Sequence, residues 1–231
     1  MSFDISHNIE IIQKKITETA KRIGSPEQEI KLLAASKAQS IDKMKIAYAA
    51  GIRNFGENYV QEFLKKWEFL KNWTPKPNLY FIGHLQTNKV KYLVDKINEI
   101  QTIDSPKLIQ TLLKEEEKNK KIIPIMIEIN IAEEKSKRGV SPKNLISFLE
   151  ALPKHPLLQI RGLMTLPPFQ EDPEKTRPYF KRMRELLEES KLKYPHFELK
   201  ELSMGMTHDF QIAIEEGSTQ VRIGEGIFGK R

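Results

Sequence analysis

The residue best placed to do chemistry is Lys37. It follows the short apolar run 31–36, at the point where a buried strand would end and direct its next side chain into the mouth of a barrel. A lysine in that place is usually functional, whereas most lysines are solvated at the surface. The other motifs of the sequence favour the functional interpretation of Lys37.

Five further motifs are spaced along the chain, and each follows a segment with the composition of a strand. They lie at residues 55–62 (FGENYVQE), 81–89 (FIGHLQTNK), 161–164 (RGLM), 202–206 (LSMGM) and 221–224 (VRIG). Each one alone is compatible with packing or with turn formation. Their shared position after strands suggests a common site.

Apolar periodicity predicts that strands and helices alternate. A helix comes first, because Ile5, Ile9, Ile12 and Ile16 recur at helical spacing. The predicted strands are residues 31–36, 52–55, 79–82, 99–103, 122–131, 157–163, 197–202 and 219–223, and helical stripes such as 41–48, 90–97 and 108–113 separate them. This α/β order predicts a parallel (β/α)8 TIM barrel with an extra N-terminal helix. A chain of 231 residues, 39% hydrophobic, is expected to form it as a single domain, residues 1–231.

Active sites of such barrels are built by the loops that follow the carboxyl ends of the strands. Lys37 and all five motifs fall at those ends. Five distinctive motifs would not gather on one face by chance. We therefore predict a functional site on that face.

Composition excludes several classes of protein. Zero cysteines exclude disulfides and thiolate metal sites, and the five histidines lack the spacing of metal ligands, so no metal site is expected. No stretch approaches the roughly 18 apolar residues of a membrane span. The N-terminus also lacks the layout of a signal peptide. We expect a soluble, cytoplasmic protein with no membrane partner.

The net charge of +7 raises the question of nucleic-acid binding. The cations lie in local clusters such as 118–121 and 181–184, with acids nearby, which is typical of solvated helix faces. No aromatic-rich strand motif that would stack bases is visible. Nucleic acid is therefore not an expected partner.

Residues 224–229 read GEGIFG and match the pattern G-x-G-x-x-G. A dinucleotide site is not expected, because two residues follow and leave no room for a helix, a strand and a ribose-binding acid. Glycines after a last strand instead let backbone N–H groups approach an anion. Barrels often bind phosphate in the loops after strands seven and eight, here 203–207 and 224–226. A phosphate site opposite Lys37 suggests a phosphorylated aldehyde cofactor held as an imine.

This combination of motifs resembles the pyridoxal phosphate homeostasis protein family, whose bacterial members resemble the N-terminal barrel of alanine racemase. The similarity runs from about Leu32 to Arg231 and is most specific at residues 35–37, 55–62, 203–206 and 221–224. The resemblance implies that Lys37 forms a Schiff base with pyridoxal 5′-phosphate (PLP) through its neutral amine.

The resemblance also implies how the cofactor is held. Ser203 would donate its hydroxyl to the phosphate, and backbone N–H groups near Thr207, Gly224 and Glu225 would complete the cradle. Arg222 would face the pyridine nitrogen. A permanently cationic partner keeps that nitrogen unprotonated, so the ring would be a weak electron sink and its chemistry restrained.

The remaining pocket residues follow from the same resemblance. Asn58 would sit near the cofactor ring, and Met164 and Met206 would line the pocket as packing residues. His84 has two open interpretations, a cofactor neighbour or a half-buried structural histidine.

Three glutamates near the motifs have less certain roles. Glu57 and Glu62 either order the pocket through hydrogen bonds or favour the first turn of a helix. Glu225 departs from the small or hydroxyl residue that the family often has there. Its carboxylate would have to point away from a phosphate.

Function is expected to follow from the part of alanine racemase that the resemblance covers, which is the barrel alone. Proton transfer from two sides needs two groups, and the sequence offers no second-domain tyrosine. We expect a monomeric, non-catalytic protein that stores, buffers or delivers PLP, with PLP-dependent apoenzymes as possible recipients. The alternatives are a PLP-dependent enzyme, such as a weak amino acid racemase or lyase, and an RNA- or protein-binding barrel.

Overall fold

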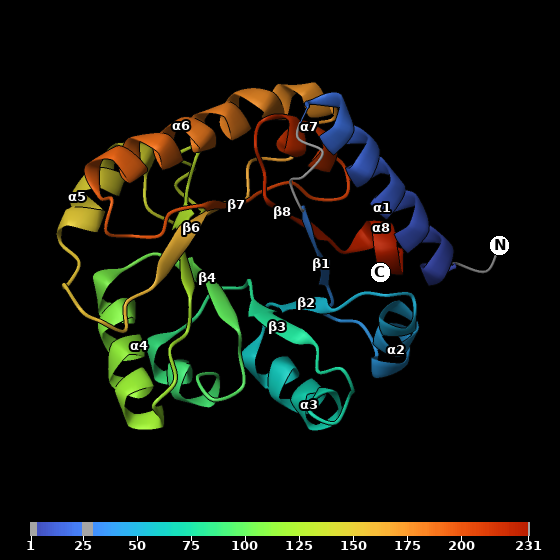
Figure 1. Ribbon diagram of the computed structural model, residues 1–231, viewed down its shortest axis with the longest axis horizontal. Helices are drawn as coiled ribbons and strands as arrows, with labels where there is room; N and C mark the ends of the chain where they lie inside the picture. Colours follow the sequence, from blue (N-terminus) through green and yellow to red (C-terminus); the bar gives the residue numbers. More distant parts are fainter. Residues whose placement is uncertain (1–3, 25–29, 231) are drawn as a thin grey trace.

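The structure, a computed structural model, describes residues 4–24 and 30–230. Eight parallel strands close into a barrel in sequence order, and the last strand pairs with the first (Figure 1). The strands are β1 (Lys31–Ala35), β2 (Asn54–Glu57), β3 (Asn78–Phe81), β4 (Glu99–Ile103), β5 (Ile125–Ile129), β6 (Ile160–Thr165), β7 (Glu201–Ser203) and β8 (Gln220–Ile223). The predicted TIM barrel is confirmed. The prediction about a signal peptide rests partly on residues 1–3, which lie outside the described residues.

Helices surround the ring of strands (Figure 1). They are α1 (Ile5–Arg22), α2 (Ile41–Ala49), α3 (Val60–Leu70), α4 (Pro106–Asn119), α5 (Leu145–Glu150), α6 (Arg177–Lys193), α7 (Phe210–Glu215) and α8 (Glu225–Phe228), with short 3-10 helices η1 (Thr87–Tyr92), η2 (Pro142–Asn144) and η3 (Pro173–Thr176). Helix α1 is the predicted extra helix. Its four periodic isoleucines are buried, and Asp4 caps it by accepting from the N–H groups of Ser6 and His7 at 2.9 and 3.1 Å.

Several predicted bounds were wrong. Strands β5, β6 and β7 begin later than predicted, because the apolar residues before them form turns or precede Pro124, which has no N–H to donate to a strand ladder. The predicted helix over residues 90–97 is the 3-10 helix η1 followed by turns. All four apolar residues of its stripe are nevertheless fully buried. The periodicity identified the buried face but not the type of helix.

The barrel interior divides into an apolar and a polar half. On the apolar side, Leu33, Tyr80 and Ile82 form a cluster separate from the main core between strands and helices. On the polar side, the Ser203 hydroxyl donates to Gln101 Oε1 at 2.8 Å. Strands β7 and β4 are not neighbours, so this bond crosses the interior. Gln101 Nε2 in turn donates to Glu99 Oε1 at 2.6 Å.

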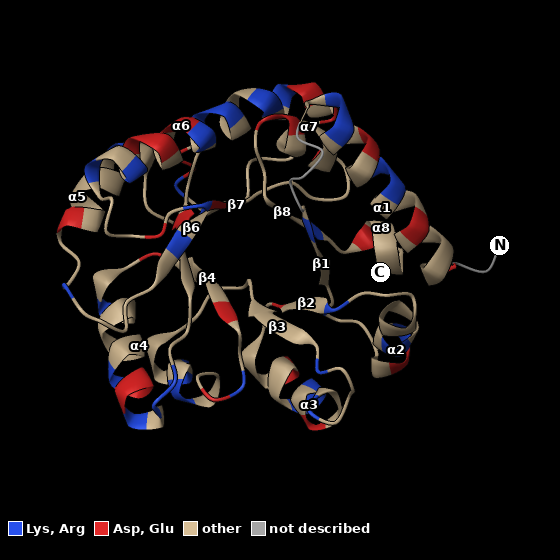
Figure 2. Cartoon of the chain, in the orientation of Figure 1, with Lys and Arg blue, Asp and Glu red and all other residues tan. Residues whose placement is uncertain are grey.

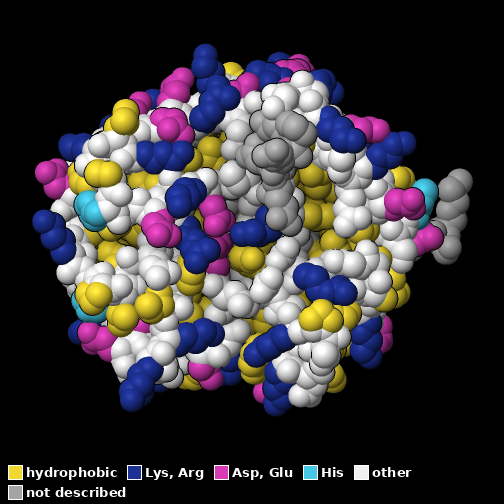
Figure 3. Space-filling model, viewed as in Figure 1, with side chains coloured by type: hydrophobic (Ala, Val, Ile, Leu, Met, Phe, Trp, Pro, Cys, Tyr) yellow, Lys and Arg dark blue, Asp and Glu magenta, His cyan; other side chains and the backbone are white. Residues whose placement is uncertain are grey.

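The amino-terminal ends of the strands carry a charged cluster inside the barrel. Lys31 Nζ lies 3.2 Å from Glu201 Oε2, and an Arg161 guanidinium nitrogen lies 3.9 Å from Glu201 Oε1. Figure 3 shows acidic and basic side chains together at the centre of the molecule in this view. Burial, reinforced by repulsion from Glu201, raises the pKa of Glu99 to about 7. The interior therefore holds a carboxyl group that titrates near neutral pH.

Outside the barrel, Lys and Arg alternate with Asp and Glu along α4 and α6 (Figure 2). Arg182 pairs with Glu185 and Glu189 at 3.1 and 2.8 Å, as expected for a solvated helix face. No helix of the described residues has the length and apolar character needed to cross a membrane. The same residues contain no group of three or more His, Cys, Asp or Glu side chains that could hold a metal ion.

Replacing Glu99 with Gln should stabilise the protein at alkaline pH. The pKa of Glu99 is about 7 when folded, against an ordinary value of 4.5, so between these values the folded state binds more protons than the unfolded one. Wild-type stability therefore falls as pH rises through this window. The difference between E99Q and wild type should grow by up to about 3 kcal/mol from pH 4.5 to 8.5, at about 1.4 kcal/mol per pKa unit. Urea unfolding measures it.

The matched control is Glu10→Gln, at a side chain that is 83% exposed and whose charge therefore contributes little to stability. A Glu99→Gln effect of equal size at both pH values would contradict a raised pKa.

Candidate functional site

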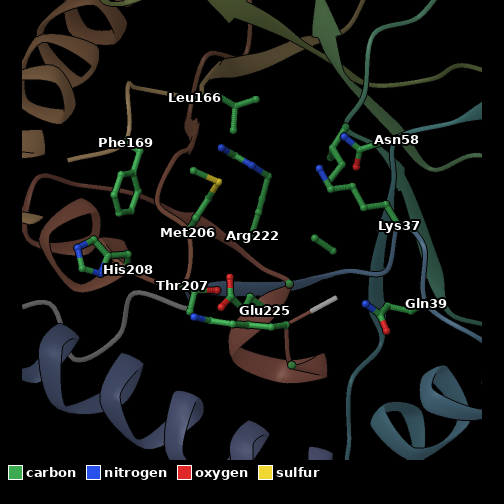
Figure 4. Close-up of a pocket in the computed structure, with 15 residues that line it drawn as sticks. Lys37, Gln39, Asn58, Leu166, Phe169, Met206, Thr207, His208, Arg222 and Glu225 are labelled. Atoms are coloured by element: carbon green, nitrogen blue, oxygen red, sulfur yellow. The ribbon is translucent and has the colours of Figure 1, made fainter. Parts of the chain in front are cut away.

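A cavity of about 850 Å³ lies at the carboxyl ends of the strands. Seven of the ten predicted site residues line it: Lys37, Asn58, Met206, Thr207, Arg222, Gly224 and Glu225. Four segments supply them, the ones that follow β1, β2 and β7 and the end of β8. Figure 4 shows Lys37 and Asn58 on one side of the cavity and Arg222 and Met206 on the other. Loops far apart in sequence thus meet at one place.

Strand alternation directs Lys37 into this cavity. Leu33 belongs to the interior cluster and Ala35 lines the cavity, whereas Ala34 belongs to the core outside the barrel. Successive side chains of a strand point to opposite faces. Lys37 continues the inward series one step beyond the end of β1, where its amine can meet a ligand.

Arg222 lies across the cavity from Lys37 and is held rigidly. Its guanidinium donates to the Ser203 hydroxyl at 2.5 Å and to the Thr165 carbonyl at 2.7 Å. Complete burial lowers the pKa of Arg222 to about 10, and the nearby carboxylates of Asp209 and Glu128 oppose this shift. The side chain therefore stays cationic at neutral pH.

The loops after β7 and β8 form a surface of open backbone N–H groups. The Thr207 hydroxyl accepts from the Gly226 N–H at 3.0 Å and so links the two loops. A Cβ at Gly224 would lie 3.3 Å from the Ala35 carbonyl oxygen, so a side chain there would crowd β1. Within the described residues, the N–H groups of Thr207, His208 and Gly224 have no hydrogen-bond acceptor. Such groups are ready to bind an anion.

Ser203 does not line the cavity, which corrects the expectation that its hydroxyl faces a ligand. It is fully buried beneath Arg222 and is already bonded to Arg222 and Gln101. Its side chain points into the barrel but lies too deep along β7 to reach the cavity. The hydroxyl that reaches the cavity from this segment belongs to Thr207.

Met164 and His84 also lie elsewhere. Met164 is fully buried and outside the cavity lining. His84 is exposed and lines a separate pocket with Asp104 and Arg138. It follows Gly83, whose backbone packs closely on Asn58.

Residues that the sequence analysis missed complete the lining. Leu166 and Phe169 belong to the proline-rich loop after β6, and His208 follows Thr207. Phe169 is 77% exposed, and its ring centroid lies 5.4 Å from that of His208. The rule that loops after strands build the site would have included this loop, which the sequence analysis did not count among its motifs.

Asn58 depends on the glycine that packs against it. A Cβ at Gly83 would lie 2.1 Å from the Asn58 carbonyl oxygen and 2.5 Å from its Cα. Backbone atoms cannot yield as a flexible side chain can. The Asn58 Oδ1 atom is buried without a hydrogen-bond partner among the described residues, so it is available to a donor on a ligand.

Gly83→Ala should therefore displace Asn58 and destabilise the fold. Overpacking of this kind costs about 1 to 3 kcal/mol, measurable by urea unfolding. Gly24→Ala is the control, because no atom of the described residues lies within 4 Å of its Cβ position and its backbone is left-handed (φ +70°). Equal stability of Gly83→Ala and wild type would contradict the close approach.

Known proteins similar to this chain match it over almost its whole length. Residues 4–231 match the family model of the alanine racemase N-terminal domain. The pyridoxal phosphate homeostasis protein of Aquifex aeolicus is 44% identical over 220 residues, which cover 95% of each chain. Among solved structures, PipY of Synechococcus elongatus without PLP superposes with a TM-score of 0.87 at 29% identity, covering 97% of this chain and 100% of PipY. PipY with PLP bound gives a TM-score of 0.81 at 31% identity, covering 93% and 100%.

Proposed function

Because the chain belongs to the pyridoxal phosphate homeostasis protein family, whose barrel is that of the alanine racemase N-terminal domain, we propose that it binds PLP in the cavity described above. One observation carries the proposal. An amine (Lys37), a buried guanidinium (Arg222) and two loops with open N–H groups converge on the same cavity. The related PipY, solved with PLP bound, supports it.

The phosphate is assigned to the loops after β7 and β8. The N–H groups of Thr207, His208 and Gly224 and the Thr207 hydroxyl supply donors from two directions. Glu225 is exposed, so its backbone can approach the anion while its carboxylate stays in solvent. The donor chemistry of this surface fits a dianion.

Lys37 and Arg222 are assigned to the two ends of the cofactor ring. When bound, PLP supplies an aldehyde that condenses reversibly with a primary amine. Lys37 would provide that amine, which can attack an aldehyde only when it is neutral, and the condensation would release one water molecule. Arg222 can only donate hydrogen bonds, so it disfavours a proton on a ring nitrogen that it faces. This arrangement favours holding the cofactor over activating it.

The proposed role is storage, buffering or delivery of PLP inside the cell by a monomer, with PLP-dependent apoenzymes as recipients. A reversible covalent bond to one lysine allows both retention and release. No tyrosine lines the cavity in the part of the chain that the structure describes. The alanine racemase resemblance calls for such a group as a second acid–base, and this favours a carrier over a racemase.

The visible absorption spectrum of the protein loaded with PLP tests the covalent assignment. We expect a protonated-imine band that borohydride bleaches, with the reduced adduct mapped to Lys37. Lys37→Ala should lose the band, whereas Lys45→Ala, a change at an exposed lysine, should keep it. Wild-type loading in Lys37→Ala would refute the assignment, and amino acid turnover that depends on Lys37 would favour an enzyme.

The phosphate assignment is tested separately with Thr207→Val. This change keeps the shape of the side chain and removes its hydroxyl, so we expect affinity for PLP to fall about two- to tenfold, the equivalent of one hydrogen bond. Affinity for pyridoxal, which lacks the phosphate, should not change. An equal loss for both ligands would place the phosphate elsewhere.

A further inference from the structure

Behind Lys37, outside the ring of strands, lies a buried ionic cluster that the binding of PLP does not itself explain. Lys66 of α3 donates to Glu57 Oε1 and to Glu62 Oε1, each at 2.7 Å. The Lys66 side chain is 7% exposed, that of Glu57 1% and that of Glu62 25%. We call these three residues the Lys66 cluster.

The Lys66 cluster holds the backbone on both sides of Lys37. Lys66 Nζ donates its third hydrogen bond to the Ser36 carbonyl at 2.6 Å, which is the peptide group before Lys37. Glu62 Oε1 accepts from the Ala38 N–H at 2.6 Å, which is the peptide group after it. The two peptide planes that set the backbone angles of Lys37 are therefore tied to one ammonium–carboxylate pair.

A third contact closes the arrangement. The Ser36 hydroxyl donates to Glu57 Oε1 at 2.5 Å, and Ser36 is itself fully buried. Ser36 thus lies on the outer face of the strand while Lys37 lies on the inner face. The cluster fixes Ser36 through its hydrogen bonds. Because Ser36 and Lys37 are consecutive and point to opposite faces, fixing Ser36 also fixes the direction of Lys37.

The backbone that follows Lys37 is strained. Ala38 has φ +59°, a left-handed conformation that costs a residue other than glycine about 1 kcal/mol or more. Its N–H is the group that Glu62 binds. Strain of this kind persists where surrounding contacts over-determine the backbone, and here the Lys66 cluster supplies those contacts.

The energetics also argue against a purely stabilising role. Removing ammonium and carboxylate groups from water costs about as much as their attraction returns, so buried ion pairs add little net stability. Burial raises the pKa of Glu57 even though Lys66 opposes the shift, and Glu57 Oε2 has no partner within the described residues. A well-packed apolar group would serve a core better. What the cluster adds is a fixed geometry.

We propose that Lys66, Glu57 and Glu62 are positioning residues that fix the backbone of Lys37 so that its amine meets the cofactor aldehyde. The inference rests on the proposed function. In the condensation, the nitrogen lone pair attacks the aldehyde carbon, a C=N bond replaces the C=O bond, and the oxygen leaves as water with two protons from the amine. A fixed amine makes this step effectively intramolecular. None of the three residues lines the cavity.

Glu62 is the position to substitute, because its partly exposed side chain lowers the risk of unfolding. Glu62→Ala removes the acceptor for the Ala38 N–H, and Glu62→Gln keeps an oxygen there. Glu68→Ala is the matched control on the same helix, where it breaks an exposed pair with Lys71 at 2.6 Å. All variants are made in the full chain, with thermal unfolding as a check of folding.

Three readings are taken on each variant: the equilibrium constant and rate of imine formation with PLP, the affinity for 4′-deoxypyridoxine 5′-phosphate, which has no aldehyde, and the exchange rate of the Ala38 amide proton. We expect Glu62→Ala to reduce the imine equilibrium constant and rate about tenfold or more, to leave affinity for the aldehyde-free compound within twofold, and to speed Ala38 exchange at least tenfold. Glu62→Gln should recover most of each loss, and Glu68→Ala should match wild type.

Unchanged imine formation and Ala38 exchange in Glu62→Ala would overturn the inference and leave the proposed function standing. An equal loss of affinity for both ligands would also overturn it, because that result indicates general damage to the cavity. Absence of an imine in the wild-type protein would overturn the proposed function and this inference together.

Discussion

Closure of the barrel by the pairing of β8 with β1 is the constraint on which the site depends. The register places Ala34 beside Ile223, so the segments that follow these residues, with Lys37 on one and Gly224 on the other, leave the sheet side by side. The approach is close enough that a Cβ at Gly224 would lie 3.3 Å from the Ala35 carbonyl oxygen. An open sheet with the same strand order would place β1 and β8 at opposite edges, and Lys37 would then lie far from the loop after β8.

The two halves of the barrel interior support different sides of the cavity. Its apolar half, around Leu33 and Ile82, lies under the strands that carry Lys37 and Asn58, whereas its polar half supports Arg222. Arg222 is 3% exposed, and Ser203 and the Thr165 carbonyl each accept one hydrogen bond from its guanidinium. The polar half of the interior thus holds Arg222, which forms one side of the cavity, in place.

Sequence reasoning recovered the parts of this arrangement that follow from periodicity. The position of Lys37 after an apolar run predicted that it faces the mouth of the barrel, and eight alternating units sufficed for the barrel, whereas Arg222 was expected from the family resemblance alone. Periodicity does not predict how deep along a strand a residue lies. Ser203 was therefore expected in the cavity, although it lies beneath Arg222. His84 has the parity of an inward residue, but β3 has already ended at Phe81. Whether Ser203 and His84 reach the cavity depends on neighbouring side chains and on the path of each loop, which a local sequence pattern does not record.

Lys66 shows a second limit. A lysine on a helix is normally a surface residue, and its partners Ser36 and Glu57 lie 30 and 9 positions away in sequence. Helical spacing from Phe63 and Leu70 places Lys66 on the buried face of α3, but no local pattern identifies its partner Ser36 in another strand. The expectation that Glu57 and Glu62 order the pocket through hydrogen bonds did point toward this region, although it lacked the ammonium that joins them.

The series of hydrogen bonds inside the barrel has a direction. Arg222 donates to Ser203, Ser203 to Gln101, and Gln101 to Glu99. Arginine has no acceptor, and Glu99 has no proton to give while it is ionised, so above the Glu99 pKa of about 7 the two ends impose the same order on every group between them. The hydroxyl of Ser203 and the amide of Gln101 then each have a single permitted orientation. Above that pH the hydrogen atoms are ordered along one line, from the wall of the cavity to the opposite end of the barrel.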